Sequence, residues 1–359
     1  MTKKLIIFII SFLVLTGCGV QDNILEDLLL AEVTGYDAAG KNQIRGSTVV
    51  AVSQSGEKSQ MGKEVYAATT HTGKNFIQKT EAEASKRLVG GRLQAVVYGE
   101  ELAKQGIYDY VDTYRRDPAI GRNLYLAVVD GKAEDIVKIE SKMLKTPDVK
   151  TKELIEQNSQ ANLPETNLHT FLYYYYGDNM DPVMPLLKQE KDHIRVKGIA
   201  LFKNDKYIGK HIPYEDGFLF KMLYGNFKNG IYEIRLKENS YMNIQNISSS
   251  VEYNINTNKK PAANISVHIE GSVVEVQDVD LKKRSVISKL ERDAEKVFQK
   301  NLKKMVRMFQ DNDVDPLALG DKARSQIRRF DKKHWYDIYP SIPVTVHVKV
   351  KLVQEGITE

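Results

Sequence analysis

Cys18 is the only cysteine among the 359 residues, and the sequence before it has the order of a secretory signal. Met1–Lys4 is a short cationic start, and Leu5–Leu15 (LIIFIISFLVL) is an uncharged apolar run. Leu15-Thr16-Gly17 then leads directly into the cysteine, so small residues stand at a possible cleavage site. The apolar run has about eleven residues, whereas a membrane-spanning helix needs roughly twenty. The chemistry this arrangement offers is covalent modification of the Cys18 thiol.

The residues Leu15–Cys18 resemble the bacterial lipobox, in which the cysteine sulfur is joined to diacylglycerol and the chain is cut before it. The alternatives are an ordinary cleaved signal with a chance cysteine, or a short uncleaved anchor. Because the single cysteine occupies the one position that a lipobox requires, we expect residues 1–17 to be a lipoprotein signal peptide. Cys18 is then the lipid attachment site, and two acyl chains are sufficient for stable anchoring.

Other recognisable reaction centres are absent from the sequence. The seven histidines lack the spacing of zinc ligands. The sequence contains no Gly-x-Ser-x-Gly, no phosphate-binding glycine loop and no second cysteine. We therefore expect no catalytic residue, no cofactor-binding residue and no metal ligand, and we expect a non-enzymatic binding or assembly protein outside the cytoplasm. A serine or carboxylate site assembled from distant residues is the open alternative.

The composition narrows the class of partner. Removal of residues 1–17 lowers the formal charge from +5 to +3, because only Lys3 and Lys4 are lost. No Lys/Arg cluster with interleaved aromatic residues stands out, so nucleic-acid binding gains no support. With Cys18 acylated, no disulfide is available, and packing must stabilise the chain. About 340 residues usually form two or three domains.

The first part of the chain alternates between strands and helices. We predict strands at 28–35, 43–53, 64–71, 93–98 and 123–129, and helices at 75–89, 99–106 and 107–116. This alternation predicts a mixed sheet with helices packed against it. A polar helical segment at 142–165 marks a boundary. In the run Tyr173–Tyr176 the four rings cannot all face one way on a helix, so some must lie in a core or at a contact.

The second part is richer in strands. A hairpin is predicted at 195–210, a helix at 213–224, and strands at 231–236, 251–255, 264–275 and 344–353. The clearest helix is 283–310, whose apolar residues recur every three or four positions with Lys, Arg and Glu opposite. We interpret this stripe as a core face. A further helix should begin with Asp315 as N-cap and Pro316 as its first residue, and run to about Arg329.

The order of these pieces resembles the Ger(x)C family, the lipoprotein C subunits of nutrient germinant receptors in spore-forming bacteria. The resemblance is carried by segments in the family's order: 28–37 (LLLAEVTGYD), 73–76 (GKNF), 91–106 (GRLQAVVYGEELAKQG), 114–127 (YRRDPAIGRNLYLA), 197–210 (KGIALFKNDKYIGK), 315–327 and Trp335 with the final strand to Gly356. The sequence departs from the family at residues 19–21, where Trp-Asp is common after the cysteine, and at residues 119–121, where acidic and Arg residues are common.

The resemblance implies an α+β fold of three domains, each a mainly antiparallel or mixed β-sheet with helices packed against it. The expected division is a signal peptide at 1–17, an N-terminal domain at 18–145, a middle domain with a helical linker at 146–258 and a C-terminal domain at 259–359. The resemblance also implies two integral membrane subunits, A and B, as partners. It places the protein on the outer face of the spore inner membrane, without catalysis and without direct nutrient binding.

Two alternatives come from other classes. A lipid-anchored solute-binding protein of a transporter usually has two doubly wound α/β lobes, and the β-rich stretch 194–275 argues against that architecture. A cell-wall hydrolase is disfavoured by the missing catalytic constellation.

Overall fold

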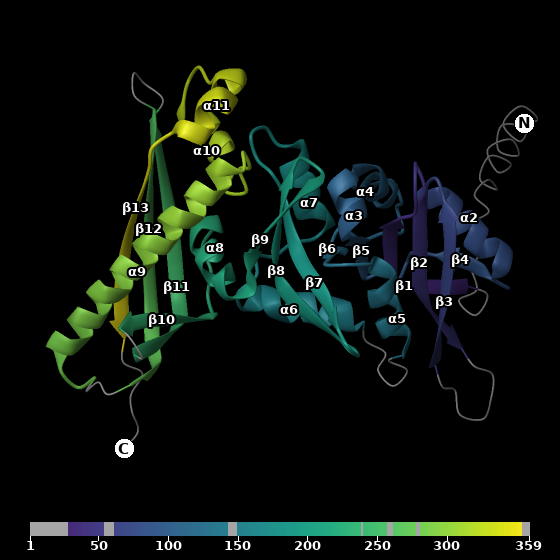
Figure 1. Cartoon of the computed structure of the whole chain (residues 1–359), viewed down its shortest axis with the longest axis horizontal. Helices are drawn as coiled ribbons and strands as arrows, with labels where there is room; N and C mark the ends of the chain where they lie inside the picture. Colours follow the sequence, from purple (N-terminus) through teal and green to yellow (C-terminus); the bar gives the residue numbers. More distant parts are fainter. Residues whose placement is uncertain are drawn as a thin grey trace, which may run out of the picture.

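The structure is a computed structural model that describes residues 28–53, 61–142, 149–237, 240–256, 261–277 and 281–353. The expected signal peptide and Cys18 lie outside these ranges. Figure 1 shows an elongated arrangement, with a large sheet and its helices toward one end and a four-stranded sheet at the other. Within the described ranges, no helix is both long and apolar enough to cross a membrane.

The N-terminal part begins with three antiparallel strands and continues with parallel ones. The strands are β1 (Leu28–Ala38), β2 (Ile44–Ser53), β3 (Met61–Thr70), β4 (Arg87–Val89), β5 (Ala95–Gly99) and β6 (Tyr125–Val129). β5 and β6 have nearly every residue buried, as expected for parallel strands covered on both faces. The helices in this part of the chain are α2 (Gly73–Glu83), α3 (Glu100–Gln105), α4 (Tyr108–Arg115), α5 (Ala133–Lys142), α6 (Lys150–Gln160) and α7 (Leu168–Tyr176).

The middle part extends the same sheet. Its elements are β7 (Val183–Glu190), β8 (His193–Lys203), β9 (Lys206–Pro213), the 3-10 turn η2 (Tyr214–Asp216) and α8 (Gly217–Tyr224). The large sheet has the order β3-β2-β1-β5-β6-β7-β8-β9, with β4 beside β1. β6 and β7 are paired only at Val128–Leu186 and Val129–Leu187, so a short ladder joins the two parts of this sheet.

The C-terminal part is a four-stranded sheet crossed by a long helix. Its elements are β10 (Ile231–Lys237), β11 (Ser240–Asn256), β12 (Ala262–Val276), α9 (Arg284–Asp311), α10 (Leu319–Gln326), α11 (Lys332–Ile338), the 3-10 turn η3 (Tyr339–Ser341) and β13 (Val344–Val353). The predicted stripe on the long helix is confirmed, because Leu290, Phe298 and Phe309 are buried. β13 alternates buried and exposed residues as its sequence predicts.

The α+β class is confirmed, and the described chain lacks the two doubly wound lobes of the solute-binding alternative. The three-domain division stays a prediction. Its boundaries after residues 145 and 258 both fall outside the described ranges. β11 and β12, on either side of the second boundary, are antiparallel neighbours from Met242–Val276 to Asn256–Ala262.

Two predicted helices are wrong in their extent. The helix expected at 75–89 ends at Glu83, because Ala84 is extended and Leu88 instead lies opposite Leu29 in the β1–β4 ladder. The helix expected from Pro316 to Arg329 is α10. It begins only at Leu319, because Ala318 adopts a left-handed conformation, and it ends at Gln326, because Ile327 is extended. In both cases tertiary contacts decide the boundary that periodicity alone places elsewhere.

The free edge of β13 is covered by side chains of α9. The Val350 N–H donates to Glu295 Oε1 at 3.2 Å, and the Leu352 N–H donates to Glu291 Oε1 at 3.0 Å. An uncovered edge strand is a template for pairing with another chain. The two glutamates therefore protect the outer strand of this sheet and fix the long helix along it.

Asp37, at the end of β1, holds the first turn of α5. Its Oδ1 accepts the Ala133 N–H at 2.7 Å, and its Oδ2 accepts the Glu134 N–H at 2.9 Å. Burial raises the pKa of Asp37, while these two N–H groups lower it. The family-like segment 28–37 thus ends on a residue that connects the first strand to a helix about 96 positions later.

We predict that Asp37→Ala lowers the free energy of unfolding by about 1–2 kcal/mol, because two helix N–H groups lose their acceptor. For domains of this size the melting temperature should fall by about 2–8 °C, measurable by thermal unfolding followed by circular dichroism. Glu101→Ala is the matched control, because this glutamate side chain is 75% exposed and, among the described residues, pairs only with Lys104. Equal melting temperatures for the two variants would contradict the capping role of Asp37.

Candidate functional site

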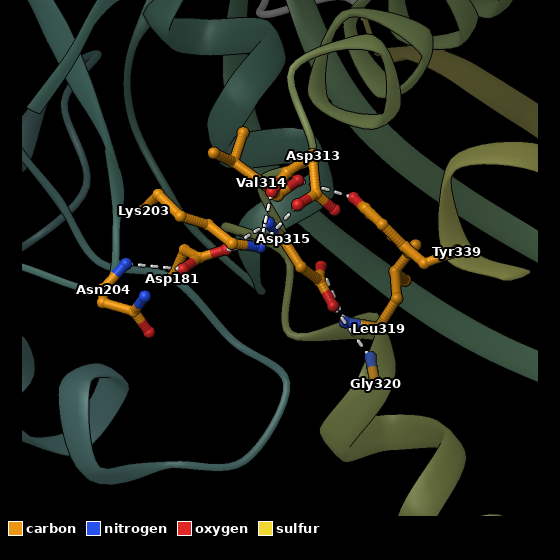
Figure 2. A network of polar contacts seen from close by, with 9 residues as sticks. All are labelled: Asp181, Lys203, Asn204, Asp313, Val314, Asp315, Leu319, Gly320 and Tyr339. Carbon is orange, nitrogen blue, oxygen red and sulfur yellow. Dashed lines mark hydrogen bonds and ion pairs between the residues drawn. The ribbon is translucent and has the colours of Figure 1, made fainter. Parts of the chain in front are cut away.

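Cys18, the site residue predicted from the sequence, lies outside the described residues, so its lipid attachment stays a prediction. The described chain draws attention to a different place. Buried carboxylates gather where the large sheet meets the C-terminal part (Figure 2). We call this cluster, formed by Asp181, Lys203, Asn204, Asp313 and Asp315, the carboxylate junction.

Three connections bring these residues together. Asp181 lies just before β7. Lys203 ends β8, and Asn204 follows it in the turn to β9. Asp313 and Asp315 lie between α9 and α10. Asn204 has a φ of 54°, a left-handed conformation that asparagine tolerates in tight turns. The antiparallel pairing of β7 with β8 places Asp181 next to that turn.

Asp181 connects the two parts of the molecule through backbone groups. Its Oδ1 accepts the Asn204 N–H and its Oδ2 accepts the Asp315 N–H, both at 2.8 Å. Its own N–H donates to the Asp315 carbonyl oxygen at 3.0 Å. Asp181 and Asp315 thus form a reciprocal pair of hydrogen bonds across the boundary between the two sheets.

Asp315 acts on the C-terminal side of the junction. Its carboxylate accepts the N–H groups of Leu319 at 2.9 Å and Gly320 at 2.8 Å, both in the first turn of α10. The prediction that Asp315 is the N-cap residue is wrong, because Ala318 occupies that position and the helix begins at Leu319, but the Asp315 carboxylate still accepts N–H groups of the first turn. A Cβ atom at Gly320 would lie 2.1 Å from Asn179 Cβ, so the close approach of the two parts requires glycine here.

Lys203 provides the cation of the junction. Its Nζ lies 3.6 Å from Asp181 Oδ2 and 3.3 Å from Asp313 Oδ2, and it donates to the Asp313 carbonyl oxygen. Tyr339 closes the far side, since its hydroxyl donates to the Val314 carbonyl oxygen at 2.7 Å (Figure 2). The polar groups drawn there are engaged with one another and with main-chain atoms.

The buried environment shifts the pKa of both carboxyl groups upward. The pKa of Asp315 is raised to about 7, mainly by burial and also by the nearby Asp181 carboxylate, while the Leu319 and Gly320 N–H groups and Lys322 oppose the shift. Burial also raises the pKa of Asp181, against the lowering effects of Lys203 and of the Asn204 and Asp315 N–H groups. Perturbed carboxyl groups occur at catalytic centres and also in structural networks. Here their oxygens are committed to main-chain N–H groups.

A surface groove lies between α4 and α7, on the N-terminal side of the molecule. Its volume is about 730 Å³, and its lining includes Arg115, Arg122, His169, Tyr173 and Tyr176. Tyr173 and Tyr176 are 57% and 55% exposed. Aromatic and arginine side chains are the types enriched in protein interfaces.

The run of four tyrosines is divided between core and surface, as its sequence predicts. Tyr174 stacks on Tyr224 with ring centroids 5.8 Å apart, and Tyr175 stacks on Tyr108 at 4.3 Å. Tyr173 and Tyr176 are the pair left exposed at the groove.

Sequence reasoning found Asp315 through its capping pattern but missed Asp181 and Lys203. Asp181 stands in Asp-Pro, a common turn dipeptide, and nothing local marks it as buried. Its role depends on a contact with a residue 134 positions away, which no local pattern reports. Within the described ranges, no three His, Cys, Asp or Glu side chains are grouped as metal ligands.

Comparison with protein families gives two consecutive matches. Residues 21–189 match the model described as spore germination protein N-terminal domain, and residues 197–356 match the model described as spore germination B3/GerAC like, C-terminal. The two models together cover nearly all of the chain that follows the predicted signal peptide.

Similar proteins and a similar solved structure agree with these matches. The chain is 28% identical to spore germination protein GerQC of Bacillus cereus, over 99% of this chain and 100% of that protein. It is 20% identical to spore germination protein KC of Bacillus subtilis (strain 168), over 98% of this chain and 95% of that protein. The crystal structure of the GerBC protein has a similar fold, with a TM-score of 0.61, 17% identity and coverage of 89% of this chain and 97% of that one.

The raised pKa of Asp315 predicts a distinctive pH dependence of stability. A folded-state pKa of about 7 lies above the unfolded value of about 3.9. The contribution of this group is therefore complete below about pH 4 and is lost as the pH rises toward 7. Asp315→Asn cannot ionise, so the advantage in unfolding free energy of the unaltered protein over this variant should be larger at pH 5 than at pH 7.5. At about 1.4 kcal/mol for each pKa unit, the whole change is about 4 kcal/mol, of which roughly 2.5 kcal/mol falls between pH 5 and pH 7.5.

Denaturant unfolding of both proteins at the two pH values measures this change. Asp311→Asn is the control, because this carboxylate is exposed and pairs with Arg307 at the end of α9. A difference between Asp315→Asn and the unaltered protein that stays constant with pH would show that Asp315 does not titrate in this range.

Proposed function

The chain belongs to the Ger(x)C family, the C subunits of spore nutrient germinant receptors, and on this premise we propose that it acts as a lipid-anchored scaffold of its receptor. The observation that carries the proposal is the ordered match of both spore germination domain models to residues 21–189 and 197–356. The scaffold holds the receptor together and takes part in its signalling during germination.

Lipid on Cys18 is the proposed membrane attachment. The support is the Leu15–Cys18 pattern after a short apolar run, together with the absence of any other cysteine in the sequence. Two acyl chains give stable anchoring where one gives only reversible binding. On this proposal the protein lies on the outer face of the spore inner membrane.

The proposed partners are the two integral membrane subunits, A and B, of the germinant receptor. Family membership supports this assignment, since the family is defined by such receptors. The rigid connection between the two sheets supports a scaffold, because the carboxylate junction holds them in one relative position through hydrogen bonds at 2.8–3.0 Å.

We further propose that the protein is neither an enzyme nor the high-affinity nutrient site. Asp181 and Asp315, the two buried carboxyl groups of the carboxylate junction, accept main-chain N–H groups that would otherwise be buried without partners. A catalytic acid or base needs a free oxygen directed at a substrate. These carboxylates are hydrogen-bonded to the main chain, as a structural role requires.

The anchor makes a direct prediction. Cys18→Ala should abolish incorporation of radiolabelled fatty acid, block normal processing of the signal peptide and lower the amount of this subunit recovered with the receptor. Cys18→Ser is a second variant of nearly the same size that also lacks the sulfur. Fatty-acid label that persists in either variant would rule out Cys18 as the attachment site. Retained membrane association alone would not, because the uncleaved signal or the partner subunits can hold the chain.

The scaffold makes a second prediction, tested by ligand-dependent stability. A nutrient present at a hundred times its dissociation constant stabilises the protein that binds it by about 2.7 kcal/mol, which shifts the melting temperature by several degrees. We expect no such shift for the purified chain with amino acids, sugars or nucleosides at millimolar concentration, while deletion of the gene abolishes germination. A reproducible shift with one nutrient, confirmed by calorimetry, would refute the scaffold and favour a solute-binding role.

A further inference from the structure

The positive charge of the chain is concentrated near its C-terminal end. Residues 281–353 contain 18 Lys and Arg against 9 Asp and Glu, which leaves a formal charge of +9. The whole chain has a formal charge of only +5, so the remaining residues sum to −4. Such an asymmetry indicates a surface that interacts with polyanions.

The structure places much of this charge on one face of α9. Ten residues of this helix are exposed, and eight of them are Lys or Arg; the others are Ser285 and Asp311. Seven of the cations fall within roughly a third of the helix circumference at 100° per residue. We call them the cationic ridge: Lys289, Arg292, Lys296, Lys300, Lys303, Lys304 and Arg307.

The four acidic residues of the same helix are divided between the sheet side and the ridge side. Glu291 and Glu295 accept main-chain N–H groups of β13 at 3.0 and 3.2 Å, on the side of the helix that faces the sheet. Asp293 and Asp311 remain near the ridge and lie within ion-pair distance of Lys296 and Arg307. Two of the four carboxylates of α9 are therefore used to protect the sheet edge and not to neutralise the ridge.

The described residues supply no close counterion to the centre of the ridge. Among the described residues, no carboxylate oxygen lies within 4 Å of the side-chain nitrogens of Lys300, Lys303 or Lys304. The Lys296 side chain is 78% exposed and the Arg307 side chain 60% exposed. From Lys289 to Arg307 the ridge extends about 27 Å at 1.5 Å per residue, a nearly straight and convex row of charge.

The kinds of residue exposed on α9 indicate which polyanion it binds: an acidic protein, a nucleic acid or a lipid surface. Lysine is depleted in protein–protein interfaces, and hot spots there are aromatic or arginine anchors in pockets. The exposed positions of α9 contain no aromatic or aliphatic side chain, and nucleic-acid binding would favour aromatic stacking platforms and grooves. An anionic lipid surface requires only charge, and each basic residue close to it strengthens attachment about fivefold.

We propose that the cationic ridge of α9 docks on the phosphate headgroups of an anionic membrane. Figure 1 shows α9 at the opposite end of the elongated molecule from β1, the first described strand. This proposal depends on the lipid anchor proposed above in one respect only, the orientation of the molecule on the membrane. A tether that precedes β1 and a ridge at the other end together lay the long axis of the protein along the membrane.

The test measures the distance of the ridge from the lipid in the full-length lipidated chain, reconstituted into vesicles. Cys18 is the only native cysteine, so a single introduced cysteine can carry a fluorescent donor, and headgroup-labelled lipid is the acceptor. Ser285→Cys reports from the ridge face of α9. Asn264→Cys is the matched control, since this exposed residue lies on β12 between buried neighbours that face the helix side.

In vesicles containing phosphatidylglycerol, we expect energy transfer from position 285 to rise at least twofold over vesicles of phosphatidylcholine alone. Transfer from position 264 should not rise. The increase should disappear in 1 M salt, where the screening length falls from about 10 Å to about 3 Å. Replacement of Lys300, Lys303, Lys304 and Arg307 by Gln should weaken docking on the order of several hundredfold, from about fivefold for each cation.

A quadruple Gln variant at Lys41, Lys74, Lys132 and Lys210 removes the same net charge from exposed positions elsewhere and should dock normally. Equal transfer in the two kinds of vesicle, or unchanged transfer in the ridge variant, would overturn the proposal. Cross-linking of the ridge in native membranes gives a second readout. If the unaltered chain cross-links to a membrane protein, the ridge variant does not, and energy transfer to lipid is the same for both, the ridge binds an acidic protein surface and the proposal is overturned. Failure of the Cys18 anchor is seen separately, as loss of the chain from vesicles of phosphatidylcholine alone, where the ridge has no anionic headgroup to bind.

Discussion

The contact between Asp181 and Asp315 is the constraint on which the shape of this protein depends. The large sheet and the C-terminal sheet have no strands in common. Their relative position near the junction is set by the Asp315 N–H on Asp181 Oδ2 and the Asp181 N–H on the Asp315 carbonyl oxygen, at 2.8 and 3.0 Å. An apolar contact would allow the two surfaces to slide. Directional hydrogen bonds to main-chain atoms allow one register, because a small displacement leaves buried N–H groups without acceptors.

This arrangement also explains why two carboxyl groups are tolerated in a buried place. Burial of an unpaired charge is costly, and Lys203 lies closer to Asp313 than to Asp181. The compensation comes instead from four main-chain N–H groups, two on each carboxylate. The remaining cost appears as the raised pKa of both groups. Apolar side chains in these two positions would leave those four N–H groups without acceptors, which accounts for the acids here.

The parts of the fold that could be predicted from sequence are those determined by local periodicity. The stripe around Phe298 gave a helix whose bounds differ from α9 by about one residue, and the alternation in β13 placed that strand correctly. The predictions failed where a distant partner decides the structure. Leu88 fits a helical pattern but pairs with Leu29; Ala318 stands in a helix-forming context but is left-handed. The junction was visible only through the capping residue Asp315, since Asp181 acquires its role from a neighbour 134 positions away.

The charge distribution of α9 could not be predicted from local sequence either. In sequence, Lys, Arg and Glu alternate along the helix and read as an ordinary solvated face. In the structure, Glu291 and Glu295 turn toward the edge of β13 and the cations stay outside, so one helix presents nearly pure positive charge to its surroundings. Because the two glutamates protect the edge of β13, they do not neutralise the cations on the outer face of α9. A chain tethered at its other end would meet any anionic plane with this face, because the buried stripe and the sheet leave α9 only one side free. The protected sheet edge and the cationic surface therefore have one cause: the glutamates of α9 face the sheet and its lysines and arginines face outward.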